Sequence, residues 1–458
     1  MRATLLFATA LLAFLVVTSP AFGSGIPAER LPLPTEGIVL PNGLHVVLAP
    51  DPGARLVSVR VRYAVGSADD PNGRRGLAHL VEHLVGSKTM HIERVLASLE
   101  AAGATTFNAT TEVEDTEYFE TLTPERLETA LWVESERMGF PALDERILRE
   151  EREVVRNENR DRRVDGMLAE VAIAMHHELY PPWHPYSAIA DGAADLDRID
   201  LDDVRAFVRT WYSPANATLA IAGRFERDKV VALVGRYFGS LPRKLPPIRP
   251  EFPAEDPRSV MLAVKAPTGV DEVFVAWRTP RFGDPDDTAL DLAAKVLAGA
   301  GNDYFERSLI ADHLATSARA SEQSYRRESL FTVSAVAAPG VNPGSLADRI
   351  QNMLDAFARD ITAAQVDRAR REMRRSIVAQ LETASGRAYR LPVLLDLGVA
   401  LGPECDWERA RYDRVRREDV TRAVSRWLTL ERRVVTVALS NLSAPRRGSV
   451  VRREEVSQ

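Results

Sequence analysis

The second half of this chain repeats the first at one fixed spacing, and this repeat limits the fold more than any other feature of the sequence. The segments 199–223 and 415–439 align at a single offset, 419 − 203 = 216. The matched residues are Asp203 with Asp419, Val204 with Val420, Trp211 with Trp427, Leu219 with Val435 and Ile221 with Val437. A repeat this long indicates two duplicated domains, because solenoid repeats are much shorter.

A proline-rich segment separates the two halves. Six prolines lie between Ser240 and Ser259, and proline lacks an amide donor and disfavours helix at the preceding residue. We therefore predict a signal peptide (1–23), a first domain (24–240), a linker (241–258), a homologous second domain (259–445) and a charged tail (446–458).

Each half runs from alternating strands through a long helical middle and back to strands. Around residues 57–65 and 273–277, apolar residues alternate with polar or small ones, and an Asp-Pro turn and an apolar helical stretch follow. This order predicts an α+β fold. We expect two homologous domains, each with a mainly antiparallel sheet packed against helices. Asp200 or Asp202 can cap the helix predicted for 201–211.

Composition excludes several classes of function. The 458 residues include 59 basic and 65 acidic side chains, a net charge of −6, whereas a nucleic-acid-binding protein should carry a basic surplus. Cys405 is the one cysteine, so neither an internal disulfide nor a cysteine-based zinc site is possible.

The segment 1–23 has the pattern of a secretory signal. Arg2 precedes an apolar stretch from Leu5 to Val17, and small residues flank a possible cleavage site after Gly23. The apolar stretch is shorter than the roughly 20 residues that span a bilayer. We therefore expect export across the inner membrane to the periplasm, and no integral membrane segment after cleavage.

The residues with the most specific chemistry are His79, Glu82 and His83, in the sequence His-Leu-Val-Glu-His. On a helix, residues i and i+4 lie on one face, so the two imidazoles can bind one ion, and Glu82 lies on the same side. Two imidazoles and one carboxylate are a catalytic zinc set that leaves a position for water. Glu82 is placed to take a proton from that water. The alternative, two surface histidines, is disfavoured because the flanking residues are apolar and indicate a buried helix.

The order His-x-x-Glu-His resembles the pitrilysin/insulinase family of zinc peptidases, which includes the mitochondrial processing peptidases. The resemblance implies one Zn²⁺ per chain and a third ligand, Glu158, which follows the second histidine at the spacing 158 − 83 = 75. It also implies that Glu151, two helical turns earlier, supports the metal ligands without binding the metal itself. From the residues alone, Glu151, Glu153 and Glu158 are about equally eligible.

Further matches extend the resemblance over most of the first half. Asn108, Ala109 and Thr110 match the edge strand that binds the substrate backbone in the family, an addition of one strand to a sheet. On the residues alone, a routine strand and turn would be favoured.

The resemblance implies a secreted zinc endopeptidase that cleaves short or unfolded peptides in an enclosed chamber. In the family, four such domains close around the substrate, and this chain has two, so we expect a dimer. Ile310 and Thr316 stand where the family's second half carries Arg and Tyr. This departure favours a heterodimer with a homologous non-catalytic subunit over a homodimer. The rival functions are a non-catalytic scaffold subunit of such a heterodimer and a metal-binding or storage protein.

Overall fold

The fold is taken from a computed structural model, which describes residues 35–165, 168–187, 189, 195–249, 258–266, 268–299, 304–396, 407–440 and 450–453. The predicted signal peptide, residues 250–257 of the predicted linker and most of the predicted tail lie outside these residues. None of the helices in the described ranges is long and apolar enough to cross a membrane.

The strands of the first half form one six-stranded sheet, in the order β1-β2-β6-β3-β5-β4. Neighbouring strands are antiparallel except β2 and β6, which are parallel. The strands are β1 (Glu36–Val39), β2 (His45–Pro50), β3 (Val57–Tyr63), β4 (Thr106–Thr111), β5 (Thr116–Leu122) and β6 (Ala217–Gly223).

The second half forms a sheet of the same design, in the order β12-β7-β11-β8-β10-β9. Here β7 and β11 are the parallel pair, in the place that β2 and β6 have in the first sheet. The strands are β7 (Val260–Lys265), β8 (Glu272–Pro280), β9 (Ala315–Gln323), β10 (Glu328–Ala337), β11 (Val434–Leu439) and β12 (Val450–Arg453). The expected α+β class and the duplicated architecture are therefore confirmed.

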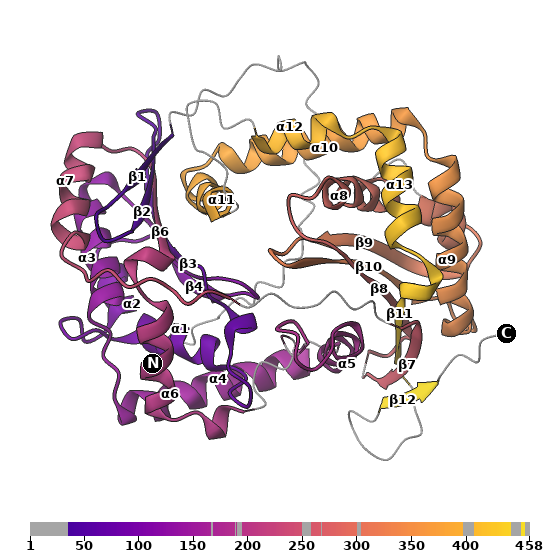
Figure 1. Cartoon of the computed structure of the whole chain (residues 1–458), viewed down its shortest axis with the longest axis horizontal. Coiled ribbons are helices and arrows are strands. Elements are labelled where there is room, and N and C mark those ends of the chain that lie inside the picture. The colour runs from indigo at the N-terminus through magenta and orange to yellow at the C-terminus, as the bar shows by residue number, and fades with distance from the viewer. Residues whose placement is uncertain are drawn as a thin grey trace.

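Helices pack against both sheets, and Figure 1 shows the two halves side by side. Those of the first half are α1 (Leu77–Ser87), α2 (Val95–Ala101), α3 (Leu127–Gly139), α4 (Glu145–Asp165), α5 (Ala169–Leu179), α6 (Leu201–Trp211) and α7 (Arg227–Phe238). Those of the second half are α8 (Pro285–Ala298), α9 (Pro343–Asp360), α10 (Ala363–Leu381), α11 (Ala384–Asp396), α12 (Trp407–Arg414) and α13 (Arg417–Trp427). The first residues of α6 and α13 are 417 − 201 = 216 apart, the offset of the sequence repeat. Asp200 caps α6 by accepting the amide of Asp203, which decides between the two candidate caps.

One strand lies where the sequence predicted only a charged tail. β12 pairs with β7 in the antiparallel direction. It has the edge position in the second sheet that β1 has in the first. The local sequence offers only two adjacent valines. Its strand conformation depends on backbone hydrogen bonds to β7, which is distant in sequence.

The two halves exchange one helix each. α5 of the first half packs on the second sheet, where Val171, Met175 and Leu179 are buried with residues of β7 and β11. α11 of the second half packs on the first sheet, where Ala388 and Leu391 are buried with residues of β2 and β6. Figure 1 shows α5 beside β7 and β11, and α11 beside β6. A helix of the other half thus packs on each sheet, and two separate apolar clusters join the halves.

This exchange explains why β3 is buried along its whole length although its sequence alternates. Val57, Val59 and Val61 face the core of the first half. On the other face, the guanidinium of Arg60 lies 4.2 Å from the ring centre of Phe119 and 5.0 Å from that of Tyr389 on α11. A strand with an alternating pattern commonly leaves its polar face in water, but here a helix from the other half covers it.

The contact between the halves contains a buried histidine, His176 on α5. Burial lowers the pKa of His176 to about 4, although its ring contacts the carbonyl of Tyr186 at 3.2 Å. The unfolded chain binds a proton near pH 6.5, as ordinary histidine does, and the folded chain does so only near pH 4. The stability that the neutral His176 contributes is therefore complete above about pH 6.5 and is lost as the pH falls towards about 4.

We expect wild-type protein to lose about 2 kcal/mol more unfolding free energy between pH 7 and pH 5 than the variant His176→Asn. Asparagine keeps a donor for the Tyr186 carbonyl but does not titrate. Urea unfolding at both pH values measures the difference. His177→Asn is the matched control, because His177 is the exposed neighbour on the same helix. Equal pH dependence in wild type and His176→Asn would contradict the assignment.

Candidate metal centre

The helix that carries the two candidate histidines is fixed by its apolar face. Leu77, Leu80, Val81 and Leu84 of α1 are buried in the core of the first half. His79 and His83 are one turn apart, with side chains 13% and 16% exposed. The helix is therefore buried on its apolar face, as the sequence predicted, and its two histidines remain partly accessible.

The start of α1 is held by Asp70, a residue that the sequence reasoning did not assign to the site. One oxygen of its buried carboxylate accepts the amide of Gly76 and the other that of Ala78, both at 2.8 Å. Gly76 has φ 93, a left-handed conformation that glycine adopts without strain. Burial raises the pKa of Asp70 to about 7, although both amides oppose the shift. The Asp-Pro turn before the helix was the available signal, but a turn does not reveal which amides its side chain accepts.

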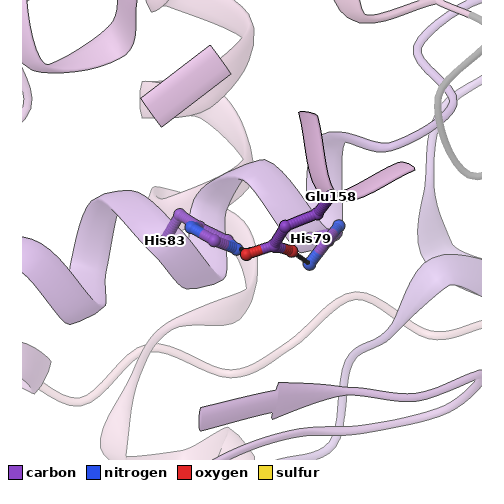
Figure 2. A group of neighbouring side chains, drawn as sticks. All are labelled: His79, His83 and Glu158. Atoms are coloured by element: carbon purple, nitrogen blue, oxygen red, sulfur yellow. Dashed lines mark ion pairs between the residues drawn. The ribbon is translucent and has the colours of Figure 1, made fainter. Parts of the chain in front are cut away.

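The third candidate ligand comes from α4, which lies beside α1. Glu158 Oε2 is 3.5 Å from His79 Nε2 and 3.5 Å from His83 Nε2. Figure 2 shows the Glu158 carboxylate between the two imidazoles. One ligand atom from each of these three residues lies within 4.8 Å of the others, and no second group of this kind occurs within the described ranges.

The other two glutamates of α4 are now distinguished. Glu151 Oε2 lies 3.3 Å from His83 Nδ1, the ring nitrogen that does not face Glu158. Glu153 points away, with its side chain 61% exposed and paired with Arg156. Residues 151 and 158 are seven apart and share a face of the helix, whereas 153 does not. Three residues that were equally eligible in sequence therefore occupy three different environments.

Two of the three ligand separations match a zinc site. In a tetrahedral site with bonds of about 2.1 Å, two ligand atoms lie about 3.4 Å apart. The two nitrogen-to-oxygen distances of 3.5 Å match this value. The contact of His83 Nδ1 with Glu151 has the form of the carboxylate–histidine pairs that orient zinc ligands. The residue types, their distances and the supporting carboxylate therefore all suit Zn²⁺.

The charges at this position favour a cation. Burial by itself lowers the pKa of His83, but hydrogen bonds to Glu151 and Glu158 and the nearby charge of Glu82 outweigh it and raise the pKa to about 10 in the protein alone. Glu82 is 7% exposed and lies on α1 between the two histidines. Carboxylates therefore surround the imidazoles, and a bound cation would be stabilised.

Within the described residues, the second half brings together no group like the three candidate ligands. The duplicated architecture thus carries the candidate centre in its first half, in keeping with the expectation of one Zn²⁺ per chain.

The predicted substrate strand is an edge strand of the first sheet. Asn108, Ala109 and Thr110 lie on β4, which pairs with β5 and has no other neighbour in the described sheet. Asn108 is exposed, while Ala109 and Thr110 are half-buried. β4 packs beside α1, so an open sheet edge and the candidate metal ligands are neighbours. Whether a peptide adds to this edge stays a prediction.

Two models of one protein family match this chain. The model described as "Insulinase (Peptidase family M16)" matches residues 45–178, and the model described as "Peptidase M16 inactive domain" matches residues 198–373. The first match contains the two histidines, Glu82 and Glu158.

Named relatives and solved structures agree with these matches. The zinc protease PqqE of Helicobacter pylori is 26% identical over 376 residues, which are 79% of this chain and 84% of the relative. The probable mitochondrial-processing peptidase subunit beta of Arabidopsis thaliana is 24% identical and covers 80% of this chain and 70% of its own length. The crystal structure of a protease from Helicobacter pylori superposes with a TM-score of 0.79 at 25% identity, over 89% of this chain and 99% of that one.

The shared fold, the two matched halves and the extent of the relatives lead to one assignment. The chain belongs to the insulinase (M16) family of peptidases, the pitrilysin-type family.

Proposed function

We propose that this protein is a zinc-dependent endopeptidase. The observation that carries the proposal is the convergence of His79, His83 and Glu158 at distances that suit one tetrahedral ion, with Glu82 on the same helix. The relatives named zinc protease support the reaction class.

His79, His83 and Glu158 would hold the ion, and Glu151 would orient His83. When bound, zinc supplies a Lewis acid and lowers the pKa of a water molecule. Glu82 accepts the proton of the attacking water and afterwards donates it to the leaving amine. One carboxylate can perform both steps, because the proton that it accepts from water in the first step is the proton that it donates to the amine in the second.

β4 would hold the substrate in an extended conformation. Its open edge offers backbone donors and acceptors that recognise main chain rather than side chains, so sequence preference should be broad. A stably folded protein has no free extended segment to offer. We therefore propose short or unfolded peptides as substrates.

We propose further that the chain works as a dimer, with a homologous non-catalytic subunit as the favoured partner and a second copy as the alternative. The support is the same departure that the sequence showed. Ile310 is half-buried and Thr316 lies exposed on β9, so neither position supplies the Arg or Tyr of the family pattern.

Export to the periplasm rests on the signal-like segment 1–23. Amino-terminal sequencing of the mature protein from a periplasmic fraction tests it, and an intact Met1 there would refute cleavage.

The decisive experiment is zinc analysis of the purified protein, followed by digestion of an unstructured peptide library. We expect about one zinc per chain and cleavage that a chelator abolishes and added zinc restores. A thermostable folded protein, incubated in parallel, should remain intact. The assay is run at a defined oligomeric state, alone and with a co-expressed homologue that keeps the Arg/Tyr segment.

The outcomes separate the alternatives. Activation by the homologue supports the heterodimer, and full activity alone supports the homodimer. A zinc-loaded chain that cleaves nothing in either setting would contradict the endopeptidase assignment and favour the scaffold subunit.

A further inference from the structure

A fully buried tyrosine connects the helix of the candidate centre with the strand next to the predicted substrate edge. Tyr118 lies on β5 and is 0% exposed. Its hydroxyl donates to the main-chain carbonyl of Glu82 at 3.1 Å. The proposed mechanism gives this residue no role so far.

The contact falls on the turn of α1 that carries the proposed base. Within an α-helix, the carbonyl of residue 82 accepts the amide of residue 86, and the Tyr118 hydroxyl adds a second donor from outside the helix. A carbonyl has two lone pairs and can accept both. The ring also approaches the helix closely, because a Cβ added to Gly86 would lie 3.6 Å from Tyr118 Cε1. Tyr118 therefore restricts how far this turn of α1 can move relative to β5 and how far α1 can rotate about its own axis.

The other end of Tyr118 is tied to the predicted substrate strand. In the antiparallel pairing of β4 and β5, Tyr118 stands directly opposite Ala109, the middle residue of the predicted segment 108–110. A peptide added to β4 would thus lie one strand away from Tyr118. Tyr118 thus pairs with Ala109 through its main chain and contacts the main chain of Glu82 through its side chain.

Neighbouring groups hold the Tyr118 ring in one orientation. Tyr63 packs edge-on at a centroid distance of 6.1 Å, and the Arg137 guanidinium lies 5.1 Å from the ring centre. Arg137 is itself buried and paired with Glu134. On the far side, the hydroxyl of Tyr212 is 3.4 Å from that of Tyr118. The ring is therefore held in place and can keep the distance between β5 and the Glu82 turn of α1 fixed.

We propose that Tyr118 is a positioning residue that sets Glu82 at a fixed distance from a peptide bound to β4. The proposal rests on the proposed peptidase function. It predicts that loss of the hydroxyl impairs the chemical step more than it impairs binding of zinc or substrate, because the ligands and the sheet edge stay in place.

The test compares Tyr118→Phe with Tyr63→Phe in the full zinc-loaded protein. Tyr63 is an ideal control because it is equally buried in the same aromatic cluster, and its hydroxyl has no hydrogen-bond partner among the described residues. We expect kcat to fall about tenfold in Tyr118→Phe, with KM and zinc affinity close to those of Tyr63→Phe. Tm should be somewhat lower in Tyr118→Phe, because only that variant loses a buried hydrogen bond. In the metal-free protein, amide hydrogen exchange at Gly86 should become about tenfold faster in Tyr118→Phe alone.

Two results would overturn the proposal: a kcat within twofold of wild type, or a loss of zinc affinity that parallels the loss of kcat. Failure of the proposed function looks different. In that case the zinc-loaded wild type itself cleaves no peptide, while exchange at Gly86 still reports whether Tyr118 holds the turn.

Discussion

Glu82→Gln should keep its zinc and lose peptide hydrolysis by about 10³-fold, within the range for removal of a general base. Glutamine has the shape of glutamate but cannot accept a proton from water at neutral pH. The three proposed ligands are untouched by the change. Glu82 is 7% exposed, so a neutral replacement of equal size should not unfold the helix.

The measurement combines zinc content with single-turnover rates on one quenched peptide. Metal analysis should give the wild-type ratio, and the rate should fall across the whole pH range instead of shifting its optimum. Normal rates would remove Glu82 from the mechanism. Loss of the metal would instead make Glu82 part of the binding set.

Glu158→Gln should weaken zinc binding by more than about 100-fold, because loss of a supporting residue already costs about 10–100-fold and a direct ligand contributes more. An amide oxygen is a poorer donor to Zn²⁺ than a carboxylate, and the change also removes one negative charge from the site. Competition with a chromophoric chelator gives the affinity.

The same helix provides two graded controls. Glu153→Gln should bind zinc as wild type does, because its side chain is 61% exposed and pairs with Arg156. Glu151→Gln should lose about 10–100-fold, since it contacts His83 Nδ1 and orients the ring. If Glu153→Gln lost the metal while Glu158→Gln kept it, the proposed ligand set would be wrong.

Local sequence patterns predicted those parts of the protein that depend on near neighbours along the chain. The positions of His79 and His83 on one helical face follow from 3.6 residues per turn, and α1 has this form. The helix predicted for 201–211 has those bounds as α6. The repeat at the fixed offset is a relation between sequences, and the matching strand orders of the two sheets bear it out.

Other features depend on which elements lie together in space. Helical pattern left three glutamates of α4 equally eligible, and the resemblance pointed to Glu158. The packing of α4 beside α1 places Glu158 against both histidines, Glu151 against His83 and Glu153 away from them. β12 forms because β7 provides an edge for it. The exchange of α5 and α11 could not be predicted from hydrophobic periodicity, because an apolar helical face does not specify which sheet it packs against.

The sequence by itself thus determined the duplicated α+β architecture and the helix that presents two histidines and Glu82, because hydrophobic periodicity and residue spacing are local properties. The tertiary structure alone decided that Glu151 and Glu158 contact the histidines while Glu153 does not, that Asp70 accepts amides at the start of α1, and that Tyr118 of β5 contacts Glu82. Each of these contacts joins residues from different elements or a loop. Their distances are set by the packing of whole helices against sheets, which no single segment of sequence specifies.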